Sequence, residues 1–430
     1  MIKSTSIYVK NFGCTSNKFD FEIMLAYLKE GGYKLANTIE TADILLINTC
    51  GVKKATEDKL FAKLTFLQKN EKPIIITGCM PKINFSALTK IVPNYAAIID
   101  PFSIDKINLA IKSIEKGRIN NLFFEHAPKC KLRMPKIKSS KIIEIVQISE
   151  GCLGSCSFCC TKFARGRLFS YPPTTIVRRI KKRLAEGVKE FYITSQDTGA
   201  YGLDIKSNIP ALLQKICKIE GDFRLRIGMM NPNHVLAILN QLVETYKKKQ
   251  IFKFLHLPLQ SGNNDVLKNM GRKYSVQDFL KIVNTFKKEM PKITIATDII
   301  CGFPNEDDNA FKDSIRIIKK IQADIVNVSK FFPRPRTKAN KMKLIPNEII
   351  KIRSRKMTKI CKTISLKRNI SWLNWSGDII IDEIGKNKSV IGRNFAYKPI
   401  VIKDRKELGT TLNIQVKKAF RTYLEGKVIQ

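Results

Sequence analysis

Three cysteines stand close together in the middle of the chain. In the stretch EGCLGSCSFCCTKFARG, residues 150–166, Cys152, Cys156 and Cys159 form a CxxxCxxC pattern on a glycine-containing loop. Three thiolates on a four-iron cluster leave one iron open to bind a small molecule. A zinc site is the alternative, since close groups of cysteines also bind zinc. The neighbouring Cys160 is poorly placed as a ligand, because its side chain starts from the next backbone unit.

A second set of cysteines is spread along the first part of the chain. Cys14, Cys50 and Cys79 each end a run that is expected to form a strand, in SIYVKNFGC, ADILLINTC and KPIIITGC. In open α/β sheets the ligand site lies beyond the carboxyl ends of the strands, so these thiols are expected to converge. The sequence therefore predicts a three-thiolate metal site, with three buried small side chains as the alternative.

The elements that must position these cysteines can be predicted from alternating strand-like and helix-like runs. The first unit, residues 1–128, adds the strand AAIID and the helical stretches FDFEIMLAYLKEGG and KKATEDKLFAKLTFLQK to the three runs above. This alternation is typical of an open parallel sheet with helices on its faces.

The central unit, residues 140–335, continues the alternation for longer. Strands are expected in IIEIVQIS, EFYITSQ, FRLRIGM, FKFLHLPLQ, ITIATDIICGFP and ADIVNVSKFF, with helices such as TTIVRRIKKRLAEG and VQDFLKIVNTFKKEM between them. Six β/α units indicate a partial (β/α)6 version of the eight-unit barrel. The chemistry of such barrels lies on loops after the strands, and the CxxxCxxC loop follows the first one.

The last two units are a connector at residues 336–370 and a small β-barrel at residues 371–430, predicted from short strands separated by Gly, Asp and Asn turns. The predicted fold class is therefore α/β: an N-terminal open parallel α/β domain, a central partial barrel and a small C-terminal β-barrel.

The charge of the chain indicates a polyanionic partner. Lys and Arg number 77 against 37 Asp and Glu, a formal net charge of +40. From Lys330 to Ile370 there are 14 basic residues and one acidic residue. Isoleucines at 349, 352, 360 and 364 predict a helix with a solvated basic face that could follow a phosphate backbone. Arg353 is one example of a basic residue there whose replacement would reduce the salt dependence of binding if it touches phosphate. The alternative is that basic residues simply cover every solvated face.

Several classes of protein are excluded or disfavoured by composition. A hydrophobic content of 44% is that of a globular chain, not a disordered one. The sequence has no apolar run near the roughly 20 residues of a membrane span, and the stretch MIKSTSIYVKNFGC lacks the features of a signal peptide. We therefore expect a cytoplasmic protein without membrane contact, whose 11 cysteines are reduced.

The whole chain resembles the methylthiotransferases of the radical S-adenosylmethionine (SAM) superfamily. The segments GCLGSCSFCCTKFARG, ITSQDTGAYG, HLPLQSGNNDVLKNMGRKYS, TDIICGFP and GRNFAYKPIVI are most similar to the archaeal and eukaryotic threonylcarbamoyladenosine (t6A) tRNA methylthiotransferases. The resemblance implies a TRAM-like RNA-binding barrel at the C-terminus. It also implies two 4Fe-4S clusters with different roles. Cys152, Cys156 and Cys159 would hold the cluster that binds and cleaves SAM, and Cys14, Cys50 and Cys79 would hold an auxiliary cluster that handles the inserted sulfur.

The implied reaction converts t6A next to the anticodon to 2-methylthio-t6A. The expected partners are a tRNA anticodon stem-loop and an external electron donor, and a monomer is expected. Breaking an unactivated C–H bond is beyond side-chain acids and bases, so the cofactor supplies the radical, and no residue is singled out as catalytic. The alternatives are methylthiolation of a ribosomal protein side chain and a non-catalytic iron–sulfur protein that binds RNA.

Polar residues at the ends of the central strands are the candidates for binding SAM. They are Gln196, Asp197, Arg226, Gln260 and Ser261. For each of them the alternative is that the side chain caps a helix or satisfies backbone amides.

The chain departs from the family pattern in places that do not touch the cysteines. Phe19 replaces a small residue, Arg336 replaces the glycine of a PRPGT motif, and PNEDD stands where PGET is typical. These departures are expected to affect local loop shape and contacts to RNA.

Overall fold

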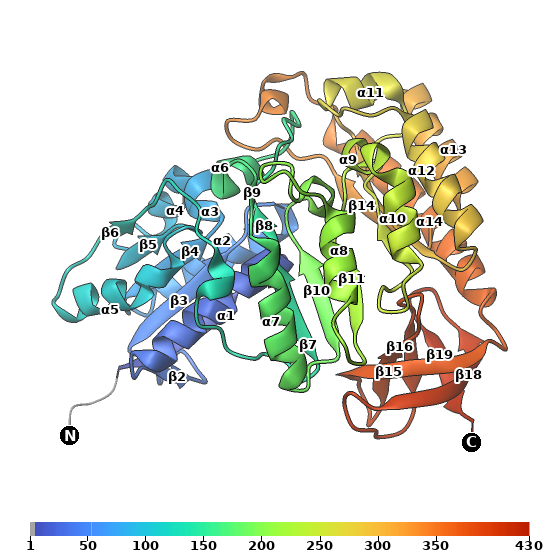
Figure 1. Cartoon of the computed structure of the whole chain (residues 1–430). Coiled ribbons are helices and arrows are strands. Elements are labelled where there is room, and N and C mark those ends of the chain that lie inside the picture. The colour runs from blue at the N-terminus through green and yellow to red at the C-terminus, as the bar shows by residue number, and fades with distance from the viewer. Residues whose placement is uncertain (1–4, 53, 430) are drawn as a thin grey trace.

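The computed structural model describes residues 5–52 and 54–429 (Figure 1). An α/β sheet, a partial barrel and a small closed barrel follow one another along the chain, which confirms the predicted fold class. The boundaries predicted for the four domains stay predictions.

The N-terminal unit is a six-stranded parallel sheet in the order β2-β1-β3-β4-β5-β6. Its strands are β1 (Ser6–Asn11), β2 (Lys34–Ala36), β3 (Ile44–Thr49), β4 (Ile74–Gly78), β5 (Ala97–Ile99) and β6 (Asn121–Phe123). Its helices are α1 (Thr15–Glu30), α2 (Lys54–Gln68), α3 (Met80–Ile83), α4 (Phe85–Ile91) and α5 (Ile107–Glu115).

Both faces of this sheet are covered by helices. Alternate residues of β3 point to opposite sides: Leu46 packs in a core with α1 and α5, and Leu45 packs in a core with α2 and α4. This explains why the run ILLINT is buried throughout and shows no polar alternation. The edge strands β2 and β6 were not predicted; each has only three residues, too few to show a strand pattern.

All six strands predicted for the central unit are present. They are β7 (Ile143–Gln147), β10 (Glu190–Thr194), β11 (Arg224–Ile227), β12 (Phe254–His256), β13 (Thr294–Cys301) and β14 (Ile325–Lys330). The strands run parallel in two three-stranded sheets, and a bridge from Leu225 to Ile251 links the two halves. Around them lie α7 (Pro173–Ala185), α8 (Ile209–Cys217), α9 (Pro232–Ala237), α10 (Leu239–Tyr246), α11 (Asn264–Asn269), α12 (Val276–Glu289) and α13 (Asp308–Ile321).

Most of the connector is one long helix, α14 (Asn347–Ile370), and the isoleucine spacing predicted a helix in part of this segment. The face that packs inward was predicted only in part. Ile364 is buried, but Ile349 and Ile352 are exposed, and Met357 packs inward with Ile364 instead. The spacing of the isoleucines alone did not identify the buried face of the helix, because Met357 and Cys361 also belong to that face.

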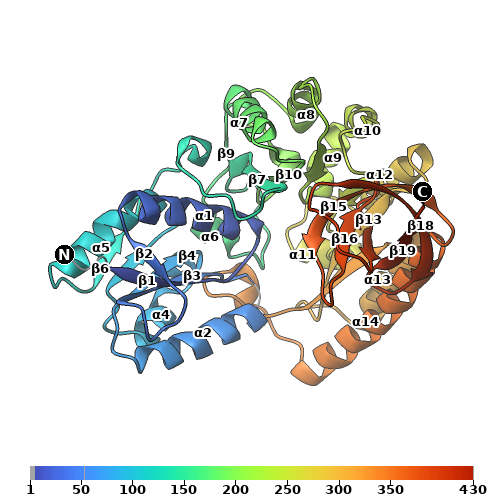
Figure 2. The same ribbon diagram turned by 90° about the horizontal axis from the view of Figure 1, so that it is seen from below.

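The C-terminal unit is a closed barrel in the order β15-β16-β17-β19-β18. Its strands are β15 (Ser376–Ile384), β16 (Val390–Arg393), β17 (Pro399–Ile402), β18 (Thr411–Ala419) and β19 (Leu424–Val428). Figure 1 shows this barrel below the central unit, and Figure 2, seen from below, shows α14 beside it. Tyr397 extends from the small barrel and packs against Tyr192 and Phe254. Its side chain therefore covers the end of the central barrel that faces the C-terminal unit.

Within residues 5–52 and 54–429, no helix has the length and apolar content required to cross a membrane.

Candidate active site

The first cysteine triad lies at one edge of the N-terminal sheet. Strands β1, β3 and β4 are neighbours and run parallel, so their carboxyl ends, and the cysteines that follow them, meet at the same edge. Cys14 precedes α1, Cys50 follows β3, and Cys79 precedes α3. Gly13 permits this approach: its φ is +129°, and a Cβ there would lie 3.0 Å from the Cβ of Cys50.

Two thiols of this triad are held in a buried environment. Burial raises the pKa of Cys79 to about 12 and also raises that of Cys50, while the nearby guanidinium of Arg165 opposes both shifts. Cys14 is exposed to solvent. Buried thiols of this kind lose their protons to a metal centre rather than to water.

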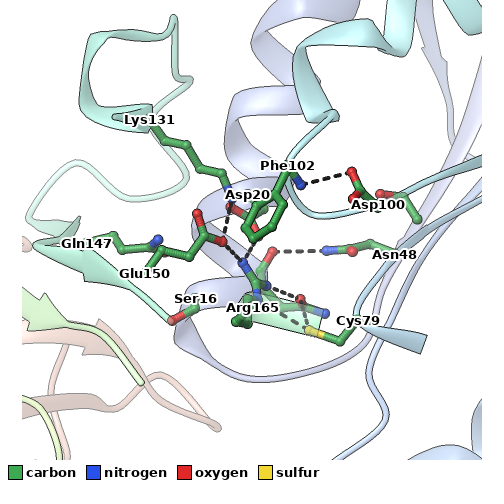
Figure 3. Close-up of polar contacts among 12 residues, drawn as sticks. Ser16, Asp20, Asn48, Cys79, Asp100, Phe102, Lys131, Gln147, Glu150 and Arg165 are labelled. Atoms are coloured by element: carbon green, nitrogen blue, oxygen red, sulfur yellow. Dashed lines mark hydrogen bonds and ion pairs between the residues drawn. The ribbon is translucent and has the colours of Figure 1, made fainter. Parts of the chain in front are cut away.

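Arg165 connects this triad to the central unit (Figure 3). Its guanidinium is buried, and its Nε donates a hydrogen bond to the Sγ of Cys79 at 3.4 Å. Nη2 donates to Asn17 at 2.8 Å, and Nη1 donates to Asp20 and Glu150 at 2.5 and 2.7 Å. Arg165 ends the short helix α6 (Thr161–Arg165), which follows the CxxxCxxC loop directly.

Lys131 completes a balanced group of four buried charges. Its Nζ lies 2.8 Å from Asp20 and 2.9 Å from Glu150, the same two carboxylates that bind Arg165. Asp20 belongs to α1 and Glu150 to β8 (Ser149–Glu150), so the group joins the N-terminal unit to the central one. Buried charges are tolerated when they are paired in this way.

The second triad lies on the loop after β7 and β8. A Cβ at Gly154 would lie 3.2 Å from the Sγ of Cys152 and 3.7 Å from that of Cys156, so both sulfurs flank this glycine. Burial, with the charge of Asp197, raises the pKa of Cys152 to about 11, and burial also raises the pKa of Cys159.

The loop of the second triad is fixed at two points, its start and its middle. The backbone N–H of Cys152 donates to Gly166 at 3.2 Å, and that of Ser157 donates to Met270 at 2.9 Å. The short strand β9 (Phe169–Ser170) pairs with β8 beside the loop. The cysteines are therefore presented by a tethered loop.

Arg272 is the counterpart of Arg165 at the second triad. Its Nη1 donates to the Sγ of Cys156 at 3.1 Å, and its Nη2 donates to the side-chain oxygen of Asn231. Asn231 in turn donates to the buried carboxylate of Asp197 through its backbone N–H at 3.0 Å. Each triad thus has an arginine that donates to one of its sulfurs.

Two predicted SAM residues lie at this loop. Gln196 accepts a hydrogen bond from the backbone N–H of Gly151 at 2.7 Å and donates to Ser16 at 3.2 Å. Asp197 is buried and lies 2.8 Å from the Nδ1 of His234. Burial alone would raise the pKa of Asp197, but hydrogen bonds and charge from His234 and Asn231 hold it below its usual value.

The other three predicted SAM residues have different surroundings. Gln260 adopts a left-handed backbone conformation with φ of +67°, and its Oε1 is buried without a hydrogen-bond partner among the described residues. Ser261 is buried and accepts a bond from the N–H of Asn263 at 3.3 Å, as a capping residue would. Arg226 is the third residue of β11, and its guanidinium lies beside Phe254, the first residue of β12, so it points toward the amino ends of the strands. Their contact with SAM stays a prediction.

Cys160 points away from the loop that carries its neighbours. It is buried in the core of the N-terminal unit, and its Sγ donates to the carbonyl of Gly51 at 3.4 Å. Burial raises its pKa to about 11.

The donor sets suit iron–sulfur clusters. In the part of the chain that the structure describes, no three His, Cys, Asp or Glu side chains converge on a point that could hold one metal ion. The fit to clusters rests on the donors themselves: three thiols at each site and, at each site, an arginine that donates to one of the sulfurs. Thiolates are the usual ligands of iron–sulfur clusters, and hydrogen bonds to sulfur tune them.

Arg165 and Arg272 were missed in the sequence analysis. Both stand in motifs quoted there, CTKFARG and MGRKYS. In a chain with 77 basic residues, nothing local distinguishes an arginine that binds a buried sulfur from one that faces solvent.

Arg353, the example of a possible phosphate contact, is not available for one. Its side chain is buried, and its guanidinium binds Glu306 and Asp308 at 3.1 and 2.7 Å. The helix α14 instead exposes other basic residues, and a surface groove of about 580 Å³ runs beside them. The groove is lined by Ser354, Arg355, Thr358, Lys359, Lys362, Thr363, Leu366 and Arg421.

Family models match three separate parts of the chain. The uncharacterized protein family UPF0004 matches residues 6–100, the radical SAM superfamily matches residues 146–318, and the TRAM domain matches residues 378–429.

Relatives with a named activity match nearly the whole chain. A probable threonylcarbamoyladenosine tRNA methylthiotransferase of Pyrococcus horikoshii is 39% identical and covers 98% of this chain and 99% of its own. That of Archaeoglobus fulgidus is 37% identical and covers 98% of both. The human threonylcarbamoyladenosine tRNA methylthiotransferase is 32% identical and covers 98% of this chain and 74% of its own.

Solved structures share the fold at low identity. The radical SAM methyltransferase TsrM of Kitasatospora setae has a TM-score of 0.58 and 12% identity, and covers 78% of this chain and 77% of its own. The cobalamin-dependent radical enzyme OxsB has a TM-score of 0.52 and 12% identity, and covers 84% of this chain and 56% of its own.

Proposed function

The chain belongs to the family of threonylcarbamoyladenosine tRNA methylthiotransferases, and we propose that it converts t6A next to the anticodon of tRNA to 2-methylthio-t6A. The observation that carries the proposal is the pair of cysteine triads, which the buried Arg165 group joins across two units. One triad would hold the cluster that binds SAM, and the other would hold the cluster that handles the inserted sulfur. The reaction therefore needs both triads to be held in one rigid arrangement.

Cys152, Cys156 and Cys159 would hold a 4Fe-4S cluster with SAM, and Cys14, Cys50 and Cys79 would hold a second one. When bound, these groups supply the radical and the sulfur chemistry that side chains cannot supply. Two arginines of the chain position the cysteine sulfurs. Arg272 donates to Cys156 and Arg165 donates to Cys79, which stabilises thiolate charge at each site. Gln196 fixes the start of the cysteine loop through the N–H of Gly151.

The proposed partner is the anticodon stem-loop of tRNA, bound along α14 and the C-terminal barrel. Exposed basic residues of α14 beside the groove support this surface, as does the match to the TRAM domain. The reaction also requires an external electron donor, and we propose that the enzyme acts as a monomer in the cytoplasm.

Iron content tests the two-cluster proposal. Protein reconstituted without oxygen is expected to bind about eight irons per chain, because two triads each hold a four-iron cluster. Cys160→Ala should bind as many, since that thiol faces the N-terminal core. About four irons in the wild-type protein, or a loss of iron in Cys160→Ala, would show that the ligands are assigned wrongly.

Salt dependence tests the proposed RNA surface. Each lysine that touches phosphate releases counterions, so the logarithm of the binding constant should fall by roughly 0.7 to 0.9 per contact for each tenfold rise in salt. Lys359→Ala and Lys362→Ala should each reduce this slope by about one contact, as measured by fluorescence anisotropy with the stem-loop. Lys215→Ala, on α8, is the matched control and should keep the full slope. An unchanged slope in both groove variants would show that RNA binds to another surface of the protein.

A further inference from the structure

A cavity of about 570 Å³ lies where the central barrel, α14 and the C-terminal barrel meet. Its wall includes Phe254 and Thr294, which begin β12 and β13, so the cavity is at the amino ends of these strands. It is the size of an ordinary small-molecule site. The complete lining is Arg226, Phe254, Thr294, Asp324, Ile325, Val326, Asn327, Val328, Thr358, Cys361, Lys362, Ser365, Asn369, Arg393, Tyr397, Lys398, Pro399, Arg421 and Thr422.

The cavity continues into the groove along α14. Thr358, Lys362 and Arg421 line both spaces. RNA bound on the basic face of α14 would therefore lie beside the mouth of the cavity, and an unstacked loop base would be within reach of it. Loop bases leave their stack more easily than paired bases, so the free-energy cost of moving one into the cavity is small.

Arg226 is held rigidly in the wall of this cavity. Its guanidinium lies 5.3 Å from the ring centre of Tyr192, 4.9 Å from that of Phe254 and 5.2 Å from that of Tyr397. These contacts orient the guanidinium without using its hydrogen-bond donors. Its Nε is buried and has no hydrogen-bond partner within the described part of the chain.

Two other cations of the cavity, Arg393 and Lys398, are already paired. Arg393 binds Asp382 at 3.0 Å, and Lys398 binds Asp324 at 2.9 Å. Among the described residues, no carboxylate lies within ion-pair distance of Arg226. Glu190 lies near it, but burial and the charge of Asp382 raise the pKa of Glu190 well above its usual value, so this carboxyl is a weak counter-charge. A partly buried cation with a free donor favours an anionic ligand.

The polar groups of the cavity continue into the barrel. Asn327 lines the cavity and donates to Asp298 at 2.8 Å, and the other oxygen of Asp298 lies 2.8 Å from Nε2 of His256. A base that enters past Arg226 therefore meets hydrogen-bonding side chains and not a closed apolar wall.

We propose that Arg226 binds the threonine carboxylate of t6A and thereby selects the modified nucleotide over plain adenosine. The inference rests on the proposed function and adds to it the residue that recognises the substrate. Adenine itself carries no anion, whereas the threonylcarbamoyl group adds one carboxylate, which an arginine binds through two parallel hydrogen bonds. The threonylcarbamoyl chain separates the carboxylate from C2 by several bonds. The carboxylate can thus lie at the amino end of the barrel while C2 faces the cysteine-bearing end.

The experiment compares two synthetic anticodon stem-loops on the full-length reconstituted protein with SAM. One carries t6A, and the other carries the same nucleotide with the threonine carboxylate converted to an amide. The wild-type protein should bind the t6A stem-loop about tenfold to a hundredfold more tightly than the amide. Arg226→Gln should bind both equally, at the affinity of the wild type for the amide, and Arg226→Lys should recover part of the preference. Arg316→Gln, an exposed arginine on α13, is the matched control and should keep the full preference.

The outcomes separate this inference from the proposed function and from a role of Arg226 in binding SAM. If Arg226→Gln retains the preference for t6A, or loses affinity for SAM instead, the inference is overturned. If the wild type forms 2-methylthio-t6A but binds the t6A and amide stem-loops equally, the function stands and the inference fails. If the wild type forms no methylthio product on any stem-loop, the proposed function fails and the inference falls with it.

Discussion

Replacing Cys50 by alanine is expected to abolish the methylthio product while 5′-deoxyadenosine, the product of SAM cleavage, still forms. Cys50 lies at the edge of the N-terminal sheet, whereas SAM is assigned to the loop of Cys152 in the central unit. The variant should bind about half of the wild-type iron. Cys152→Ala should show the opposite pattern, with loss of SAM cleavage and therefore of all product. Both products can be measured by mass spectrometry of the same reaction.

Cys217→Ala is the matched control for these two variants. Cys217 ends α8 on the outside of the central barrel, so its loss should leave iron content and both products unchanged. If Cys50→Ala loses SAM cleavage as fully as Cys152→Ala does, the two triads do not divide the reaction as proposed.

Replacing Arg165 by methionine is expected to destabilise the contact between the first two units by about 3 to 5 kcal/mol. The change leaves Asp20 and Glu150 buried with Lys131 as the remaining cation of the group. Removing one partner of a buried ion pair costs this much because the other charge stays desolvated. The loss should appear as a lower midpoint of thermal unfolding and faster proteolysis between the units.

The control for this change is Arg167→Met, two residues further along the chain. Arg167 is exposed, so its loss should change the free energy of unfolding by less than about 0.5 kcal/mol and leave the midpoint nearly unchanged. Arg165→Lys keeps the charge but has fewer hydrogen-bond donors, so its midpoint of unfolding should lie between those of Arg165→Met and Arg167→Met. An unchanged midpoint in Arg165→Met would mean that the four buried charges do not hold the units together.

The common position of Cys14, Cys50 and Cys79 at one edge of the sheet could be predicted from the sequence, whereas their role as cluster ligands stays a prediction. Parallel strands end at a common edge, so Cys14, Cys50 and Cys79 were expected to meet before the order of the sheet was known, and β1, β3 and β4 are indeed neighbours. The six central strands were recognisable for a related reason: each is a run of buried β-formers between amphipathic helices.

What the sequence did not predict depends on contacts between distant residues. Arg353 and Arg165 look like any other basic side chains, and only the fold brings carboxylates from other elements to pair with them. Arg336, which stands where the family has glycine, adopts a φ of +61° and donates to the carbonyl of Lys82 in the N-terminal unit. Phe19 is accommodated in the core, fully buried.

Mass spectrometry of nucleosides tests the central claim most directly. Transfer RNA that carries t6A is incubated with the reconstituted protein, SAM and a reductant, then digested to nucleosides. The account predicts that 2-methylthio-t6A appears as t6A declines, and that a stem-loop with unmodified adenosine at the same position reacts poorly. Equal reaction of both RNAs, methylthiolation of a ribosomal protein with none on tRNA, or tight RNA binding without any SAM cleavage would contradict it.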